Sequence, residues 1–169
     1  MLLYNLIYMD KNKYFEAFIY ELFKWHNEST NNKKENDLSL LKVLKLLFLG
    51  ASWNNEHLEI FNNFVAWELW PVEKDIYTAL KNNDIKNIEV TNQTSIIMGA
   101  ENILDEKYMN IWKSMVNYLK KKNPKLINYS ASTLVDITHK WNCWKLTKDY
   151  GISKIEKGLI LSEEWYFFT

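Results

Sequence analysis

The chain has 169 residues and equal numbers of basic and acidic side chains, 21 of each, so its formal net charge is zero. This length suits one domain with a real hydrophobic core and is short for two. A neutral chain is a poor candidate for non-specific nucleic-acid binding or a polybasic membrane anchor, although a local basic patch is still compatible with the composition.

The residue content favours helices and a reducing compartment. Gly and Pro are scarce, four and two, whereas eight Trp, ten Tyr and eight Phe supply aromatics for a core or a partner surface. Cys143 is the single cysteine, which excludes an internal disulfide. The N-terminus lacks the features of a signal peptide, and no run approaches the ~18–20 apolar residues of a membrane helix. We therefore expect a cytoplasmic protein.

The first predicted helix begins behind Asp10, a candidate N-cap, and continues to about Asn27 with apolar residues at three- and four-residue spacing. His26 lies on its apolar face. A packed histidine is favoured over a metal ligand, because no second ligand stands at a useful spacing. Residues 28–37 are polar and unpatterned, which predicts an exposed loop.

A central helix is predicted for residues 38–50, LSLLKVLKLLFLG, which are apolar nearly all round. Lys42 and Lys45, three residues apart, are the exceptions and are interpreted as one edge of the helix. A helix that is apolar on most faces must be covered by its neighbours. Gly50 either admits a close neighbour or ends the helix.

A corner is predicted around residues 64–80. Residues 64–67 indicate a short buried strand, preceded by the turn signal Asn62–Asn63, so we expect a small hairpin before Pro71. Pro71 is predicted to end the extended segment and to open a helix, with Glu73 in its first turn. Val72, Ile76, Tyr77 and Leu80 would form the apolar face of that helix.

The second half of the chain predicts further helices. Residues 88–91 indicate a short strand, and residues 105–119 a long amphipathic helix that ends before Pro124. Ser130 is a candidate N-cap for the next helix, and Gly151 ends the segment that follows. Residues 162–164 are predicted to begin a last helical turn.

Candidate chemistry is sparse in this sequence. His139 and Cys143, four apart, would share a helix face as metal ligands or as base and nucleophile, but zinc needs more ligands and the indoles of Trp141 and Trp144 would raise the thiol pKa. The carboxylate pair Glu163–Glu164 is interpreted as an exposed cap. No cofactor motif is present. We therefore predict no catalytic, cofactor-binding or metal-binding residue, and a protein that is not an enzyme.

Three stretches together resemble the Panacea domain, the SocA-like antitoxin family, formerly a domain of unknown function and associated with phages and mobile elements. FVAWELWPVEKDIY is similar to its AWxxGPVxxxVY segment, SASTLVDITHKWNCWKLTK to its SAxxLxxLTHxxxPWxxAR segment, and LKLLFLG to its KLLYFAxG helix. The matching residues are Lys45, Leu46, Leu47, Trp67, Pro71, Val72, Tyr77, Ser130, Ala131, Leu134, Thr138, His139 and Trp144.

The chain departs from the family pattern at three positions. Trp70 stands where the family usually has glycine. Cys143 stands in place of the proline, and Lys148 in place of the terminal arginine, of the SAxxLxxLTHxxxPWxxAR segment. Trp70 would widen the corner and present an indole to a partner, so we interpret it as a partner-binding residue.

The resemblance implies an antitoxin that neutralises a cognate toxin by direct protein contact, without a cofactor. Two alternatives stay open: an adaptor that delivers the toxin to a protease, and a DNA-binding regulator. The expected fold is mainly α, one compact domain over residues 1–169 around a central buried helix, with a small β-hairpin and a motif-matched core at about residues 38–148.

The aromatic tail, Trp165, Tyr166, Phe167 and Phe168, lies beyond the motif-matched core. Four consecutive aromatics cannot all point inward, which makes the tail a candidate partner-binding surface. The alternative interpretation is a strap that docks into the core.

Overall fold

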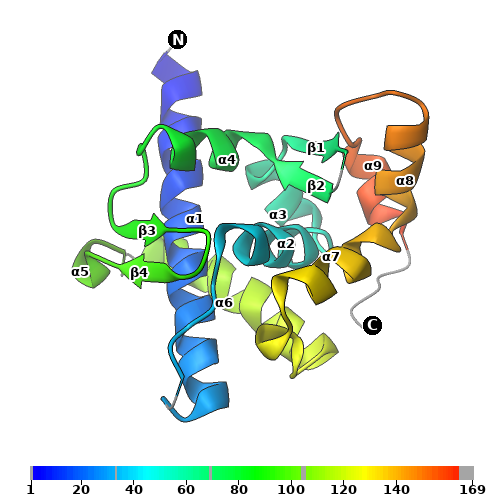
Figure 1. The fold of residues 1–169 in the computed structure, drawn as a ribbon. Coiled ribbons are helices and arrows are strands. Elements are labelled where there is room, and N and C mark those ends of the chain that lie inside the picture. The colour runs from blue at the N-terminus through cyan, green and yellow to red at the C-terminus, as the bar shows by residue number, and fades with distance from the viewer. Residues whose placement is uncertain (1, 33, 69, 104–105, 164–169) are drawn as a thin grey trace.

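The computed structural model describes residues 2–32, 34–68, 70–103 and 106–163, and among these it excludes the side chains of residues 2–10 and 106–110. It confirms the mainly α class: helices gather around a central helix, and two small antiparallel hairpins complete the fold (Figure 1). Buried apolar side chains from helices and strands form one hydrophobic cluster.

The elements follow in chain order. They are α1 (Leu2–Thr30), α2 (Leu40–Ala51), α3 (Asn55–Ile60), β1 (Phe64–Trp67), β2 (Trp70–Glu73), α4 (Lys74–Lys81), β3 (Ile88–Val90), β4 (Ser95–Ile97), α5 (Ala100–Ile103), α6 (Glu106–Lys122), the 3-10 turn η1 (Leu126–Asn128), α7 (Ala131–His139), α8 (Asn142–Asp149) and α9 (Lys157–Leu161).

Helix α1 runs unbroken along one side of the molecule, with α6 crossing against it (Figure 1). The predicted N-cap at Asp10 is therefore wrong, because that residue lies inside the helix. The helix also extends past the predicted end at Asn27. It stops where Asn31 and Asn32 take positive φ values of 51° and 55°, a conformation that asparagine tolerates better than most residues.

Helix α2 is the predicted central helix. Ser39 caps it, accepting from the Lys42 N–H, and every residue from Lys42 to Ala51 is buried. A Cβ built on Gly50 would lie 2.9 Å from the Cε of Met115, so the glycine admits α6 against the central helix.

Trp112 on α6 anchors the core between α1, α6 and the end of α3. It is fully buried, and its ring meets Tyr14 at 4.9 Å and Phe61 at 5.5 Å between centroids, both in edge arrangements. Such edge-to-face aromatic pairs stabilise the core in addition to the stabilisation from apolar burial. The helix α3 that carries the chain toward Phe61 has no counterpart in the sequence prediction.

The corner is built differently from its prediction. Strands β1 and β2 form an antiparallel hairpin with Ala66 opposite Pro71 and Trp67 opposite Trp70. Pro71 therefore stands inside the second strand and does not open a helix. Its missing N–H costs nothing there, because Ala66 donates its own N–H away from the pair, to the Ser153 carbonyl at 2.6 Å.

Glu73 ends β2 and caps the helix that follows. Its carboxylate accepts the Ile76 N–H at 2.9 Å, and α4 begins at Lys74. The pair Asn62–Asn63 connects α3 to β1 and is not the hairpin turn. Ile88 to Val90 forms the predicted short strand and pairs with β4, for which the sequence analysis predicted no element.

The stretch SASTLVDITHKWNCWKLTK is split between two helices. Ser130 caps α7 by accepting the Thr133 N–H, as predicted, but α7 ends at His139 and α8 begins at Asn142. His139 and Cys143 therefore do not share a helix face. Gly151, at φ 66°, terminates the segment as expected. Ser162 is the C-cap of α9 and does not start a helix.

Candidate functional site

The three motif stretches meet around the β1–β2 hairpin. Helix α2 and helix α7 both contact β2, and α8 contacts β1. In Figure 1 the hairpin lies above α2 and between α4 and α8. Segments far apart in the sequence thus build one corner of the molecule.

Five of the matching residues are core residues. Like Lys45, a matching residue that is also buried, these five have no exposed surface: Leu46, Leu47, Val72, Leu134 and Thr138. The Thr138 hydroxyl donates to the Val135 carbonyl at 3.0 Å, within its own helix. Ser130 is the exposed cap of α7 and Ala131 is half-buried beside it. These positions support the structure and offer no chemistry.

Lys45 is buried in the corner, contrary to its predicted place on an edge. Its ammonium donates to the Pro71 carbonyl at 3.0 Å and lies 5.1 Å from the centroid of the Trp70 ring. Because it is buried, the pKa of Lys45 is well below the ordinary lysine value. The proline carbonyl is available because the Ala66–Pro71 pair leaves it pointing away from β1.

Trp144 joins α8 to the hairpin. It is 7% exposed, and its indole N–H donates to the Trp67 carbonyl at 3.2 Å. His139 stacks on it with the ring centroids 4.3 Å apart and the planes 8° apart. The Lys148 ammonium lies 5.1 Å from the centroid of the Trp144 ring and donates to the Glu68 carbonyl at 2.9 Å. Lys148 thus holds the hairpin turn.

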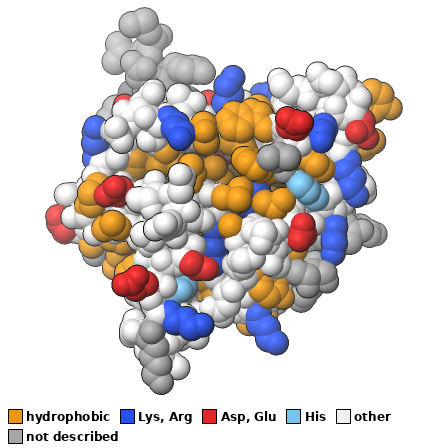
Figure 2. All heavy atoms as spheres, in the orientation of Figure 1, with side chains coloured by type: hydrophobic (Ala, Val, Ile, Leu, Met, Phe, Trp, Pro, Cys, Tyr) orange, Lys and Arg blue, Asp and Glu red, His pale blue; other side chains and the backbone are white. Residues whose placement is uncertain are grey.

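A surface pocket opens beside this corner. It has a volume of about 350 Å³ and is lined by Leu40, Leu41, Leu44, Trp70, Tyr77, Lys81 and Asn92. Trp70 and Tyr77 are half-buried, and Tyr77 meets Trp67 edge-on at 4.8 Å. Hydrophobic side chains gather on the face that α2, α4 and β2 present, in the upper middle of Figure 2.

A charged cluster missed by the sequence interpretation lies behind the hairpin. Lys11 from α1 reaches Glu73 at 2.8 Å and Asp75 at 2.6 Å, and Glu73 has no exposed surface. Burial alone would lower the pKa of Lys11, but the two carboxylates outweigh it and the pKa is raised. The sequence signal for this cluster is weak, because Lys11 is 62 residues from Glu73 and 64 residues from Asp75.

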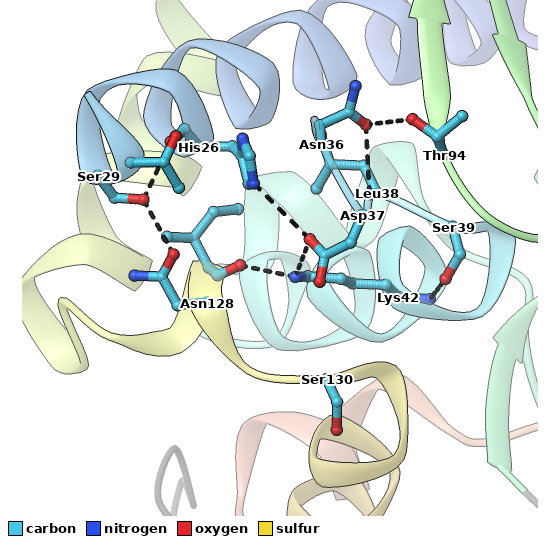
Figure 3. A network of polar contacts seen from close by, with 12 residues as sticks. His26, Ser29, Asn36, Asp37, Leu38, Ser39, Lys42, Thr94, Asn128 and Ser130 are labelled. Carbon is cyan, nitrogen blue, oxygen red and sulfur yellow. Dashed lines mark hydrogen bonds and ion pairs between the residues drawn. The ribbon is translucent and has the colours of Figure 1, made fainter. Parts of the chain in front are cut away.

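Lys42, the other lysine of α2, belongs to a separate network of hydrogen bonds and ion pairs, drawn in Figure 3. The Lys42 ammonium binds Asp37 at 2.6 Å and the Ile127 carbonyl at 2.7 Å. His26 Nε2 lies 3.9 Å from the same Asp37 oxygen. Burial lowers the pKa of His26, and Asp37 opposes that shift. The network fixes the loop before α2, and His26 is a packed histidine as predicted.

The remaining histidine and the cysteine are also buried in structural positions. Burial lowers the pKa of His57 to about 4, so its ring, beside Trp53, is neutral at pH 7. Burial, together with the nearby Glu163, raises the pKa of Cys143 to about 12, the direction predicted from its sequence neighbours. Within the described residues, no group of three or more His, Cys, Asp or Glu could hold a metal ion.

Glu163 is not the exposed cap that the sequence predicted for the pair Glu163–Glu164. Its carboxylate accepts the backbone N–H of Cys143 at 2.8 Å and so caps α8 from the far end of the chain. Glu164 and the aromatic tail, Trp165, Tyr166, Phe167 and Phe168, lie outside the described residues.

Comparison of the chain with family models, with curated proteins and with solved structures finds no match. The resemblance to the Panacea domain therefore stays a hypothesis. In the described part of the chain, no helix combines the length and apolar character needed to cross a bilayer.

Proposed function

We propose that this protein is an antitoxin that neutralises a cognate toxin by binding it directly, through the face around the β1–β2 hairpin. The observation that carries the proposal is the convergence of the three motif stretches. Lys45 reaches Pro71 across 26 residues, and Trp144 reaches Trp67 across 77. The residues on which the resemblance depends thus define one place in the molecule.

The same face has the composition of a protein-binding surface. Trp67, Trp70 and Tyr77 are half-buried, and Trp70 and Tyr77 form two walls of the adjoining pocket. Tryptophan, tyrosine and arginine dominate the residues that carry binding energy in protein interfaces, especially where apolar contact and a polar rim occur together. On this proposal the protein acts in the cytoplasm, by stoichiometric contact, with no catalytic step and no cofactor.

The test begins with a search for a small reading frame beside the gene, followed by co-expression of its product with this protein. Induction of that product alone is expected to stop growth, and co-expression of this protein is expected to restore it. The two proteins should then co-purify as an equimolar complex. Growth arrest that this protein fails to relieve, although it is present at equal level, would contradict the proposal.

The adaptor alternative has a different outcome in the same cells. An antitoxin that blocks its target leaves the toxin level unchanged, whereas an adaptor lowers it. Toxin abundance is therefore measured in strains with and without their ATP-dependent proteases. Protection that disappears in the protease-deficient strain would favour the adaptor.

A further inference from the structure

The pocket beside the hairpin has apolar walls and a positive charge bias. Among its lining residues, three leucines of α2 and the rings of Trp70 and Tyr77 are hydrophobic, and Lys81 is the only charged one. Its volume, about 350 Å³, lies at the lower end of the range of roughly 300–1,000 Å³ found for ligand pockets. The hollow therefore suits a single large side chain.

Each aromatic wall carries a lysine ammonium. Lys81 Nζ lies 5.5 Å from the Tyr77 ring centroid, and Lys45 Nζ lies 5.1 Å from that of Trp70. Ammonium groups at these distances attract the ring faces. The Lys81 side chain is exposed at the mouth of the pocket and keeps its charge in water. Lys45 is buried behind the indole, and burial lowers its pKa, so the positive charge of the pocket is that of Lys81.

Neither lysine has an ion pair within the described residues. The structure gives Lys45 one oxygen, the Pro71 carbonyl, and gives Lys81 no ion pair. Two acidic residues of the adjoining elements, Glu73 and Asp75, are already engaged with Lys11. An anion brought to the pocket would therefore meet the positive charge of Lys81, which no ion pair among the described residues offsets.

From this geometry we infer that the pocket binds an acidic segment of the partner protein, in which an aromatic or large aliphatic side chain stands within one helical turn of a carboxylate. The apolar side chain fills the hollow between Trp70 and Tyr77, and the carboxylate pairs with Lys81. This inference rests on the proposed function and adds the chemistry of the toxin segment that the antitoxin recognises.

The experiment selects peptides of about 12 residues, a length typical of groove-bound segments, from a random phage-displayed library on the intact protein. Enriched peptides are expected to carry Asp or Glu within four positions of Trp, Phe, Leu or Ile. A synthetic, fluorescently labelled consensus peptide then serves as the probe in binding titrations. Enrichment of neutral or basic peptides would overturn the inference.

Variants locate the probe on the protein. Lys81→Glu reverses the charge at the pocket mouth and should weaken binding about tenfold or more. Lys81→Gln, which only removes the charge, should have a smaller effect in the same direction, and it keeps the test valid if Lys81→Glu disturbs the end of α4. The matched control is Lys113→Glu, because Lys113 is an exposed lysine of α6 that does not line the pocket. Equal affinity of the Lys81 and Lys113 variants would overturn the inference.

The toxin assay separates this inference from the proposed function. If Lys81→Glu and Leu41→Asp lose peptide binding but still protect cells, the pocket is not the toxin site, and the antitoxin proposal survives without it. If the wild-type protein fails to protect, the antitoxin proposal fails, while the peptide titrations still decide what the pocket binds. Displacement of the peptide by a single-stranded oligonucleotide would assign the pocket to nucleic acid and overturn the inference.

Discussion

Replacing Lys45 by methionine tests the description of the corner most directly. The wild-type ammonium is fully buried, and its pKa lies well below the ordinary value of 10.5. Between these two pKa values the unfolded chain binds more protons than the native protein. Stability should therefore rise with pH across that window, by up to about 1.4 kcal/mol per pH unit, and the penalty of the buried charge is fully present below it.

Lys45→Met keeps the apolar stem and removes the ammonium. It relieves the desolvation cost but leaves the Pro71 carbonyl without its donor, which costs about 1–3 kcal/mol. The two effects oppose each other at neutral pH, so the pH dependence is the sharper measurement. Subtracting the unfolding free energy of the variant from that of the wild type cancels the other titrating groups, including Lys11 and Lys42. That difference should increase as the pH rises toward 10.5.

The assay is urea unfolding followed by tryptophan fluorescence, for both proteins, at constant ionic strength over roughly pH 6–10. Lys113→Met, at an exposed site, is the matched control and should show no such dependence. A difference between wild type and Lys45→Met that stays constant with pH would refute the lowered pKa of the buried Lys45.

The other predictions concern the corner, the charged cluster, the tail and DNA. Trp144→Ala should cost about 3–5 kcal/mol of unfolding free energy in a denaturant titration, because a nearly buried indole and its bond to Trp67 are lost. Glu73→Ala should cost about 3–5 kcal/mol, since it leaves Lys11 buried with one carboxylate fewer, and a double variant with Lys11→Met should recover part of the loss. Deleting residues 165–169 should abolish toxin protection at unchanged melting temperature if the tail contacts the partner; a lower melting temperature would indicate a core strap, and no change in either would refute both. The protein alone should not bind duplex DNA of its own promoter with submicromolar affinity at physiological salt, since zero net charge offers few phosphate contacts; a gel-shift titration checks this.

Local patterns predicted the helices well where they contain their own signals. The all-round apolar run predicted that α2 is the buried centre, and Ser130 predicted the start of α7 through its hydroxyl. The break between α7 and α8 was missed, because the sequence around Lys140 contains neither glycine nor proline to mark it. There α7 ends at His139 with Lys140 as its C-cap, and Trp141 enters the core in an extended conformation.

The corner shows why the same local signal can mislead. A proline followed by acidic residues is typical of a helix start, and a helix does begin three residues after Pro71. The extended segment continues through Pro71 because, in the register with β1, no backbone hydrogen bond is required from the Pro71 nitrogen. Glu73 caps α4, and Lys11 from α1 forms an ion pair with the Glu73 carboxylate. Lys11 is 62 residues from Glu73, so no local sequence pattern near Glu73 predicts this ion pair.

The two lysines of α2 illustrate the limit of hydrophobic patterning for the candidate site. Spaced three apart, they were interpreted as one solvent-facing edge of a helix, yet neither has exposed surface. Each ammonium reaches a main-chain carbonyl of a neighbouring segment, Lys42 that of Ile127 and Lys45 that of Pro71. A buried carbonyl needs a donor, and α2 supplies one to each side, so the lysines fix η1 and β2 against the central helix. They differ in compensation, because Lys42 also has the carboxylate of Asp37 and Lys45 has only the face of Trp70. Burial therefore lowers the pKa of Lys45 further, and this difference between two lysines three residues apart could be read only from the folded chain.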